Sequence, residues 1–420
     1  MSSSYSAAAA APADRFAVSE RRPSDGPNIG AAWGAAFAIV AGAALIGAMV
    51  SPRQAALYGL GAVMGLVLYH AAFGFTSAWR VFIADGRGAG LRAQMVMLAM
   101  ATALFFPVLA AGSLFGQPVA GLVSPVGVSV LVGAFIFGVG MQMGGGCASG
   151  TLYTVGGGST RMLITLAAFV VGSTVGAAHL PWWSAQPSFA PVSLVKLWGA
   201  WPALAANWAV FAAIAGVTVW VEKRRRGALE TSAPSPRAGL ARFARGPWPL
   251  VAGAVALAAL NFATLALAGR PWGITSAFAL WGSKIAGGLG IADVASWPYW
   301  SGAARQAELN GSVLNDVTSV MDFGIVIGAL LAAALAGRFA PTWRVPLKSA
   351  LAAVLGGLLL GYGARLAYGC NIGAYFSGIA SGSLHGWVWL VAAFLGNVLG
   401  TRLRPLFGLE VETTPRLTGC

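Results

Sequence analysis

The chain has 420 residues, of which 57% are hydrophobic and only 9% are charged. Soluble domains carry roughly 25% charged residues, so this composition excludes an ordinary soluble enzyme or binding module and indicates a membrane protein. The formal net charge of +14 then indicates basic loops between membrane spans, and we expect no nucleic-acid partner.

Apolar runs of about 20 residues, the length that crosses a bilayer, recur along the chain. They predict an all-α polytopic membrane protein, multi-pass in a bacterial inner membrane and surrounded by membrane lipid. Three cysteines make no disulfide framework, and no feature predicts a cofactor or a metal ion. The predicted spans are 29–50, 55–73, 91–111, 127–143, 161–180, 203–221, 248–268, 318–337, 346–363 and 385–401.

The runs divide the chain into two membrane halves joined by a basic linker. The first residues are rich in Ser, Ala and Pro and lack the layout of a cleaved signal peptide, so we expect them to be disordered. The predicted segments are 1–28 (disordered), 29–221 (first half, repeat core about 55–180), 222–247 (linker), 248–404 (second half) and 405–420 (polar tail).

The charges of the loops predict an orientation. The linker is strongly basic, which places it in the cytoplasm. Counting spans from it places 285–316, acidic on balance, outside. On this count the first repeat starts from outside and the second from inside, so we predict an inverted-repeat bundle, with the spans 29–50 and 203–221 standing outside the repeats.

Two short segments share the pattern Gly-apolar-Thr-Ser-Ala-aromatic, at 74–79 and at 273–278. Hydroxyl residues ahead of apolar ones are a helix-start signal, and both segments are too short to span, so we predict re-entrant half-helices. Their hydroxyls, on Thr76, Ser77, Thr275 and Ser276, are candidate donors to a small anion. Lys284 follows the second segment as a candidate anion clamp, with snorkelling to the interface as the open alternative.

A glycine-cysteine motif occurs once in each half. Gly138-Val-Gly-Met-Gln-Met-Gly-Gly-Gly-Cys147 recurs as Gly361-Tyr-Gly-Ala-Arg-Leu-Ala-Tyr-Gly-Cys370, at a constant offset of 223 (361−138 and 370−147). Glycine unwinds a helix, and unwound backbone at membrane depth survives only where protein or a water-filled cavity satisfies it. The motif therefore predicts broken helices, which together with inverted repeats are typical of transporters.

The same motif supplies the candidate substrate ligands Cys147 and Cys370. The glycines before them, Gly145, Gly146 and Gly369, let backbone amides form an anion-binding nest. The alternatives are close helix packing for the glycines and a small packed hydrophobe for each cysteine, and duplication in register favours the site. A thiol beside amide and hydroxyl donors suits a small anion with a soft sulfur atom, whereas sulfate would gain nothing from it.

These stretches resemble the YeeE/YedE family of membrane proteins, the sulfur-transport family, as does Pro271-Trp-Gly-Ile-Thr-Ser-Ala-Phe-Ala-Leu-Trp-Gly-Ser-Lys284. The resemblance implies an hourglass-shaped inverted-repeat bundle that takes up thiosulfate past Cys147 and Cys370 in turn. It also implies a small cytoplasmic TusA-like sulfur carrier as partner. The chain departs from the thiosulfate-importing pattern, since the third pathway cysteine of that pattern has no counterpart at 72–75, and Cys420 lies in the tail.

The sequence thus predicts an inner-membrane importer of a small sulfur-containing anion, with thiosulfate as the leading substrate, and not an enzyme. One alternative is a membrane sulfurtransferase that relays persulfides between the two cysteines; it needs a general base or carrier site, and no carboxylate lies near either cysteine in the sequence. The other is a channel-like or structural membrane subunit.

Overall fold

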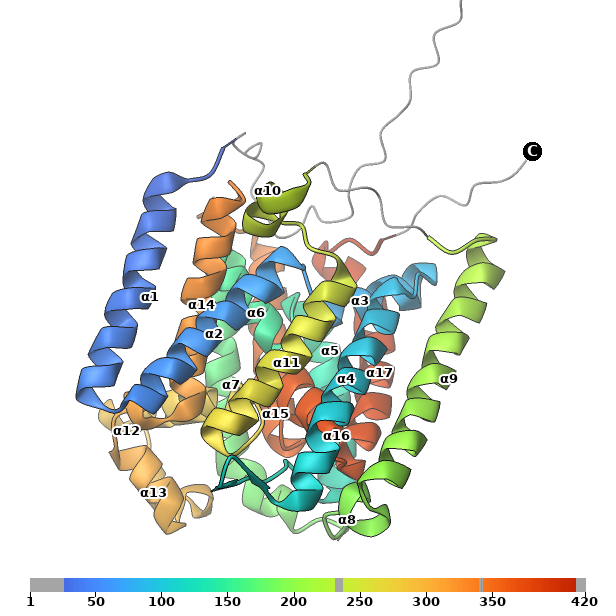
Figure 1. Ribbon diagram of the computed structural model, residues 1–420. Coiled ribbons are helices and arrows are strands. Elements are labelled where there is room, and N and C mark those ends of the chain that lie inside the picture. The colour runs from blue at the N-terminus through green and yellow to red at the C-terminus, as the bar shows by residue number, and fades with distance from the viewer. Residues whose placement is uncertain (1–25, 231–236, 340, 342, 413–420) are drawn as a thin grey trace, which may run out of the picture.

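The computed structural model describes residues 26–230, 237–339, 341 and 343–412 and is built almost entirely of helices (Figure 1). Ten helices in the described ranges are long and apolar enough to cross a membrane, and they coincide with the ten predicted spans. The prediction of an all-α polytopic membrane protein is therefore confirmed. Most of the N-terminal segment predicted to be disordered, and Cys420, lie outside the described residues.

The described residues of the first half form nine helices and four two-residue strands. The helices are α1 (Ile29–Met49), α2 (Pro52–His70), α3 (Phe75–Asp85), α4 (Ala89–Ala111), α5 (Val128–Gly144), α6 (Ala148–Gly156), α7 (Thr160–Ser184), α8 (Leu194–Trp198) and α9 (Ala200–Arg226). The strands are β1 (Ser113–Leu114), β2 (Gln117–Pro118), β3 (Val126–Gly127) and β4 (Ser188–Phe189), paired antiparallel as β1 with β2 and β3 with β4.

In the described part of the second half every named element is helical. Its α-helices are α10 (Gly239–Arg245), α11 (Leu250–Ala268), α12 (Thr275–Gly288), α13 (Ala303–Asn310), α14 (Val317–Leu335), α15 (Leu347–Leu366), α16 (Gly378–Ala380) and α17 (Leu384–Leu403). A π-helical segment, η4 (Asn371–Ser377), runs directly into α16, and the 3-10 turns are η1 (Val294–Ser296), η2 (Pro298–Trp300), η3 (Val313–Asn315) and η5 (Arg404–Phe407).

The bundle has two distinguishable ends. Helix α10 and the C-terminal end of α9 lie at one end, at the top of Figure 1, which we call the linker end. Helices α8 and α13 lie at the other, which we call the opposite end. The spanning helices connect the two ends, so each residue can be placed by the end towards which its helix runs.

Helices α2 and α11, which hold corresponding places in the predicted repeats, lie antiparallel. The Trp248 amide before α11 donates to the His70 carbonyl at the end of α2 at 2.8 Å, and the Arg53 side chain at the start of α2 donates to the Leu267 carbonyl near the end of α11. Helices of one half also pack mainly on helices of the other half. Helix α2 packs on α14, and its counterpart α11 packs on α4; likewise α5 packs on α17, and its counterpart α15 packs on α7. The two halves therefore interlock rather than stand side by side.

Helices α1 and α9, placed outside the repeats by the sequence interpretation, each pack against a helix of the predicted repeats. Helix α1 packs against α14, and α9 packs against α4. The two outer helices therefore contact α14 and α4, the helices at corresponding places in the two predicted repeats.

Glycines make the contacts between the halves close. A Cβ atom on Gly65 of α2 would lie 2.1 Å from the Ile325 carbonyl oxygen of α14, and one on Gly356 of α15 would lie 2.1 Å from the Gly144 nitrogen of α5. No side chain fits at such distances, so these backbones touch directly, as in other glycine-lined membrane helix pairs. For glycines such as these, the packing interpretation is the right one.

Helices α3 and α12 are the two predicted half-helices. With 11 and 14 residues they extend roughly 17 and 21 Å at 1.5 Å per residue, short of a hydrocarbon core of about 30 Å. Helix α3 runs to the linker end, where Asp85 pairs with Arg226 at 2.8 Å. Helix α12 runs to the opposite end and packs on α13. Each therefore starts inside the bundle.

Candidate substrate pathway

Cys147 begins a helix in the middle of the bundle. Helix α5 ends at Gly144, which packs against Gly356 at the midpoint of α15, and Gly145 follows in the left-handed conformation with φ 88°. Cys147 is the N-cap of α6, where its Sγ accepts a hydrogen bond from the Gly150 amide at 3.4 Å. Only 1% of the residue is exposed. The positive φ at Gly145 lets the chain turn sharply enough to present the thiol.

Cys370 holds the matching position in the second half. Helix α15 ends at Leu366, and Gly369 has φ 153°, a conformation that L side chains rarely adopt. Cys370 is the N-cap of η4, and its Sγ accepts from the Ile372 amide at 3.4 Å. The residue is fully buried. Both cysteines thus take the same local geometry, although the helix that follows is α in one half and π in the other.

Three of the four short helical elements, α3, α6 and η4, begin close together. The rings of Phe75, at the start of α3, and Tyr375, in η4, lie 6.0 Å apart between centroids, and the Phe75 amide also interacts with the Cys147 sulfur. Cys370 lies within electrostatic range of Cys147. Helices α3 and α6 run from this centre to the linker end, whereas α12 and η4–α16 run to the opposite end. The N-terminal amides of α3, α6 and η4, which favour anions, therefore face the centre.

Several buried polar atoms near this centre have no hydrogen-bond partner among the described residues. They are both side-chain amide atoms of Asn371, the Tyr375 hydroxyl, the Thr76 hydroxyl and both carboxyl oxygens of Asp322. Buried polar groups in native proteins are nearly always paired, and a cluster of unpaired ones indicates a place for water or a ligand. The cluster coincides with the two thiols.

The predicted hydroxyls differ in what they contact. The Thr76 hydroxyl is unpaired, and Thr275 Oγ1 accepts from Arg365 Nη2 at 3.3 Å. Ser77 donates to the Gly74 carbonyl at 3.3 Å, and Ser276 pairs with the Thr318 hydroxyl at 3.0 Å. The Thr76 hydroxyl is thus open to a ligand, and Thr275, which only accepts, still has its own proton to donate, whereas both serines already donate theirs within the protein.

Lys284 lies away from the cysteines. Its Nζ donates to the carbonyls of Leu309 and Gly311, at the end of α13 and just beyond it. It is nine residues after Thr275 on α12, roughly 14 Å further towards the opposite end. The structure therefore joins Lys284 to the loop beyond α12 and does not bring it together with the thiols.

Sequence reasoning missed Arg365, which is 9% exposed in the last turn of α15. Its Nη1 donates to the Tyr299 hydroxyl at 2.7 Å, and Arg305 lies over the ring of Tyr299, 4.0 Å from its centroid. Burial would raise the pKa of Tyr299, but the charges of Arg365 and Arg305 outweigh it and hold that pKa below its ordinary value. An arginine inside the glycine-cysteine motif, two residues beyond the predicted span 346–363, was the signal that could have found it.

Asp322 is the second residue that sequence reasoning missed. It is fully buried on α14 and lies within electrostatic range of Cys370, although the two are far apart in the chain. No carboxylate is close to either cysteine along the sequence, but the fold brings the Asp322 carboxyl close to Cys370. Helix α14 brings Asp322 in because it packs against both α12 and α6.

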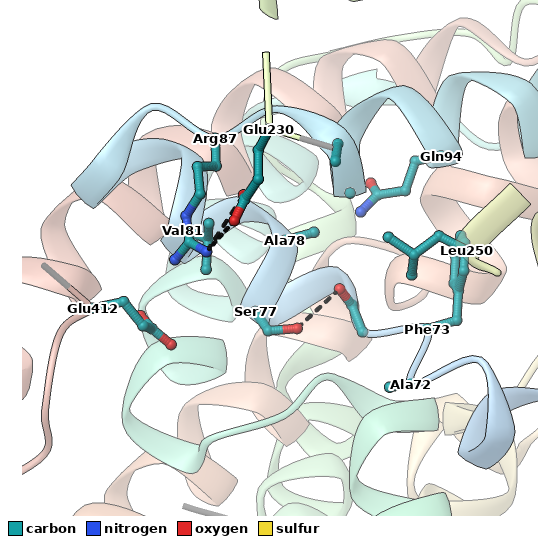
Figure 2. A pocket seen from close by; sticks show the side chains of 13 residues that line it. Ala72, Phe73, Ser77, Ala78, Val81, Arg87, Gln94, Glu230, Leu250 and Glu412 are labelled. Carbon is teal, nitrogen blue, oxygen red and sulfur yellow. Dashed lines mark hydrogen bonds and ion pairs between the residues drawn. The ribbon is translucent and has the colours of Figure 1, made fainter. Parts of the chain in front are cut away.

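A pocket of about 220 Å³ opens beside α3 at the linker end. Figure 2 shows Ser77, Ala78 and Val81 of α3 on its lining, with Arg87 bonded to Glu230 at 3.4 Å and Glu412 on the same side of the view as Arg87. Gly74, at the start of α3, also lines it. The pocket therefore connects the surface at the linker end to the segment from which α3 begins, next to Cys147.

Buried thiols at paired helix breaks within ten apolar spans define a membrane transport protein, and the chain belongs to the sulphur transport family, whose model matches residues 70–399. The family resemblance stated from the motifs is confirmed, and transport rather than enzymatic catalysis is the class of activity.

Two kinds of relative stand out. The chain is 28% identical over 350 residues to the thiosulfate transporter TsuA of Spirochaeta thermophila. The matched region covers 80% of this chain and 95% of that transporter. It is 27% identical over 352 residues to TsuA of Escherichia coli, covering 80% and 90%. It is 31% identical over 170 residues to the probable transporter YedE of Escherichia coli, covering 39% and 40%.

Proposed function

We propose that this protein imports a small sulfur-containing anion, with thiosulfate as the leading substrate, across a bacterial inner membrane. The observation that carries the proposal is the meeting of two buried thiols, Cys147 and Cys370, with the N-terminal ends of three short helices, α3, α6 and η4. Helix N-termini favour an anion, and thiols favour a soft sulfur atom over a hard oxygen. The two TsuA relatives, thiosulfate transporters by name, support the same substrate.

The proposed ligands divide by the part of the substrate that they contact. The sulfur atoms of Cys147 and Cys370 face the terminal sulfur, first one and then the other as the anion passes. Backbone amides around Gly145, Gly146 and Gly369 bind the oxygens. The unpaired groups of Thr76, Asn371 and Tyr375 supply hydrogen bonds that the protein itself leaves unmade. Ser77, Thr275 and Ser276 complete the set of hydroxyls, and Lys284 is left out because two carbonyls hold its ammonium.

The direction of transport follows from a proposed orientation. We take the two halves as inverted repeats, supported by the antiparallel packing of α2 and α11 and by the packing of helices of one half on helices of the other. The basic linker then places the linker end in the cytoplasm. On this orientation the anion enters from the opposite end, past Thr275 and Cys370, and leaves past Cys147 and Thr76 into the pocket beside α3. A TusA-like cytoplasmic sulfur carrier is the proposed acceptor there, on the strength of the family resemblance.

Uptake of labelled thiosulfate tests the function directly. The experiment uses cells without importers of their own and compares the wild type with Cys147→Ser, Cys370→Ser and the double variant. Serine keeps a small donor but removes the polarizable sulfur, so each single variant should lose most uptake while membrane insertion stays normal. Cys420→Ser is the matched control and should keep full uptake. Wild-type cells that take up no thiosulfate, or full uptake by the double variant, would overturn the thiol pathway.

Labelled sulfate and sulfite, offered to the same cells, define selectivity. We expect thiosulfate to be preferred over sulfate, because only thiosulfate carries a terminal sulfur for the thiols. Equal uptake of sulfate would leave an anion site made of helix termini alone. A persulfide trapped on either cysteine in proportion to the sulfur transported would instead support the sulfurtransferase alternative.

A further inference from the structure

Gln142 and Arg365 occupy the same position in the two halves. They are 223 residues apart, the offset that also separates Cys147 from Cys370, and each lies in the last turn of the helix before its glycine-cysteine break. Each donates to a first-turn threonine of a half-helix. Gln142 Nε2 lies 3.2 Å from the Thr76 carbonyl oxygen, and Arg365 Nη2 lies 3.3 Å from Thr275 Oγ1. One position thus carries a neutral amide and the other a permanent cation.

The guanidinium of Arg365 is buried without a counterion among the described residues. Its two terminal nitrogens donate to the hydroxyls of Tyr299 and Thr275, and its Nε is buried with no partner in the part of the chain that the structure describes. No carboxylate of the described ranges forms an ion pair with it. A buried charge with neither an ion pair nor a full set of hydrogen bonds is costly, and an anion from outside the chain would complete it.

The arginines on the linker side are engaged differently. Arg161 donates to the carbonyls of Met143 and Gly144 at 2.7 and 2.6 Å, and Arg404 donates to the carbonyl of Gln142 at 2.6 Å. Their charges therefore stabilise the C-terminal end of α5, where helix carbonyls gather. Gln142 itself pairs with Asn397 at 2.6 Å. The two sides are matched in backbone but not in charge.

We propose that Arg365, the Thr275 hydroxyl and the first amides of α12 form an anion-capture site, and that Gln142 makes the matching site on the linker side a weaker one for anions. A guanidinium presents a planar fork of donors that fits two oxygens of an oxyanion, which an amide cannot match in charge. The difference lets the Arg365 side bind the anion at a lower concentration and makes the linker side hold it less tightly. The inference rests on the proposed function and adds the residue that selects the anion.

Exchanging the two side chains tests the proposal. Arg365→Gln makes both positions alike, and Gln142→Arg places a cation on both sides. The Michaelis constant and turnover for labelled thiosulfate are measured in proteoliposomes, per molecule of inserted protein. We expect Arg365→Gln to raise the Michaelis constant about tenfold or more while much of the turnover remains, since a hydrogen bond to a charged group is lost. Gln142→Arg should instead lower the turnover by slowing release, without a comparable rise in the Michaelis constant.

Two further variants separate recognition from folding. Arg365→Lys keeps the charge but loses the fork, so its Michaelis constant should fall between those of the wild type and Arg365→Gln. Thr275→Val removes the hydroxyl that Arg365 contacts and should also raise the Michaelis constant. If Arg365→Gln does not insert, these two variants carry the test. Unchanged Michaelis constants in the inserted variants, or equal losses in Arg365→Lys and Arg365→Gln, would overturn the capture site.

A binding titration keeps this outcome apart from failure of the transport proposal. Thiosulfate and sulfate are titrated into purified protein by calorimetry, with Arg365→Gln as comparison. Anion binding by the wild type that weakens about tenfold in Arg365→Gln supports the capture site even if no thiosulfate uptake is found. Equal binding by the two proteins contradicts the capture site even where wild-type uptake is normal.

Discussion

Arg80 holds Glu412 by both carboxylate oxygens: Nε lies 3.0 and 2.7 Å from them, and Nη2 lies 2.6 Å from Oε1. Arg80 is on α3, whose first turn borders Cys147, and Glu412 belongs to the segment after the last membrane helix. The two side chains are 8% and 19% exposed. The pair ties the C-terminal segment to the half-helix and places Glu412 on the lining of the linker-end pocket.

Loss of this ion pair should lower stability in a pH-dependent way. Burial would raise the pKa of Glu412, but Arg80 outweighs it and lowers that pKa below the ordinary glutamate value. A carboxylate whose pKa is lowered by folding stabilises the folded protein at pH values above its ordinary pKa. This stabilisation is lost as the pH falls from the ordinary pKa through the lowered pKa of the folded protein. At pH 7, Glu412→Gln should cost about 1.5–3 kcal/mol. Thermal unfolding in detergent should show the gap to the wild type narrowing as the pH falls below about 4.

Glu410→Gln is the control for that measurement. Glu410 is exposed and contributes its backbone carbonyl, not its carboxylate, to Arg404. Its replacement should leave the unfolding temperature unchanged at both pH values. An equal loss in both variants would mean that any charge change in the C-terminal segment acts, rather than the contact with Arg80.

Uptake should fall at alkaline pH through Tyr299. The pKa of Tyr299 lies below its ordinary value, because Arg365 and Arg305 outweigh the effect of burial. As the pH rises through this pKa, the phenolate gains a negative charge beside Arg365 and competes with the incoming anion. The Michaelis constant of the wild type should therefore rise with pH, whereas that of Tyr299→Phe should stay nearly flat. Parallel pH profiles in proteoliposomes would show that another group titrates.

The four hydroxyls should differ in their effect on uptake. Thr76→Ala and Thr275→Ala remove hydroxyls whose protons no described protein group accepts, and they should raise the Michaelis constant roughly tenfold or more, the effect of losing a hydrogen bond to a charged group. Ser77→Ala and Ser276→Ala remove groups already bonded within the protein, to Gly74 and Thr318, and should change it much less. Equal effects of all four variants on initial uptake rates would contradict this ranking.

Two glycines of one helix should respond oppositely to alanine. A methyl group on Gly65 would collide with the backbone of Ile325, so Gly65→Ala should destabilise the protein by about 1–3 kcal/mol or prevent assembly. Gly59, on the same helix, has no atom within 4 Å of the added position, and Gly59→Ala should be neutral or stabilise by up to about 1 kcal/mol. The measurement is the unfolding temperature of each variant in detergent, compared with that of the wild type. A Gly65→Ala variant that unfolds at the wild-type temperature would contradict the close contact of α2 with α14.

The proposed orientation predicts which loops face which side. Reporter fusions in the linker, within 227–238, should be active as cytoplasmic reporters, and fusions between α12 and α14, within 289–312, should be active outside. Both loops on the same side would refute the inverted repeats and the direction of transport built on them.

The sequence was informative where a rare residue sat in a repeated pattern. The membrane spans followed from apolar runs, and the duplicated motif around Cys147 and Cys370 predicted two helix breaks, because cysteine is rare and glycine unwinds helices. Lys284 and Arg365 show where this reasoning ends. Both are cations near the motifs, but only packing decides their direction: α12 carries Lys284 away from the centre, whereas α15 brings Arg365 beside Thr275.

Contacts between distant segments were beyond the pattern for the same reason. Asp322 lies near Cys370 because α14 packs against α6 and α12, and no local spacing records that arrangement. The serines were chosen with the threonines because their residue types alone do not reveal a bond to Gly74 or Thr318. The residue types predicted what kind of site this is, whereas tertiary packing determines which residues form it.

The glycine contacts between the halves have a mechanical consequence. Where Gly65 meets Ile325 and Gly356 meets Gly144, the backbones of the two halves are in direct contact. A rigid-body movement of one half relative to the other would therefore cause steric clashes between backbone atoms. We expect the long helices to act as a stationary frame. Movement is then confined to side chains and short helices around Cys147 and Cys370. The barrier to the passing anion is therefore a thin one, about as thick as the distance between these two N-cap residues.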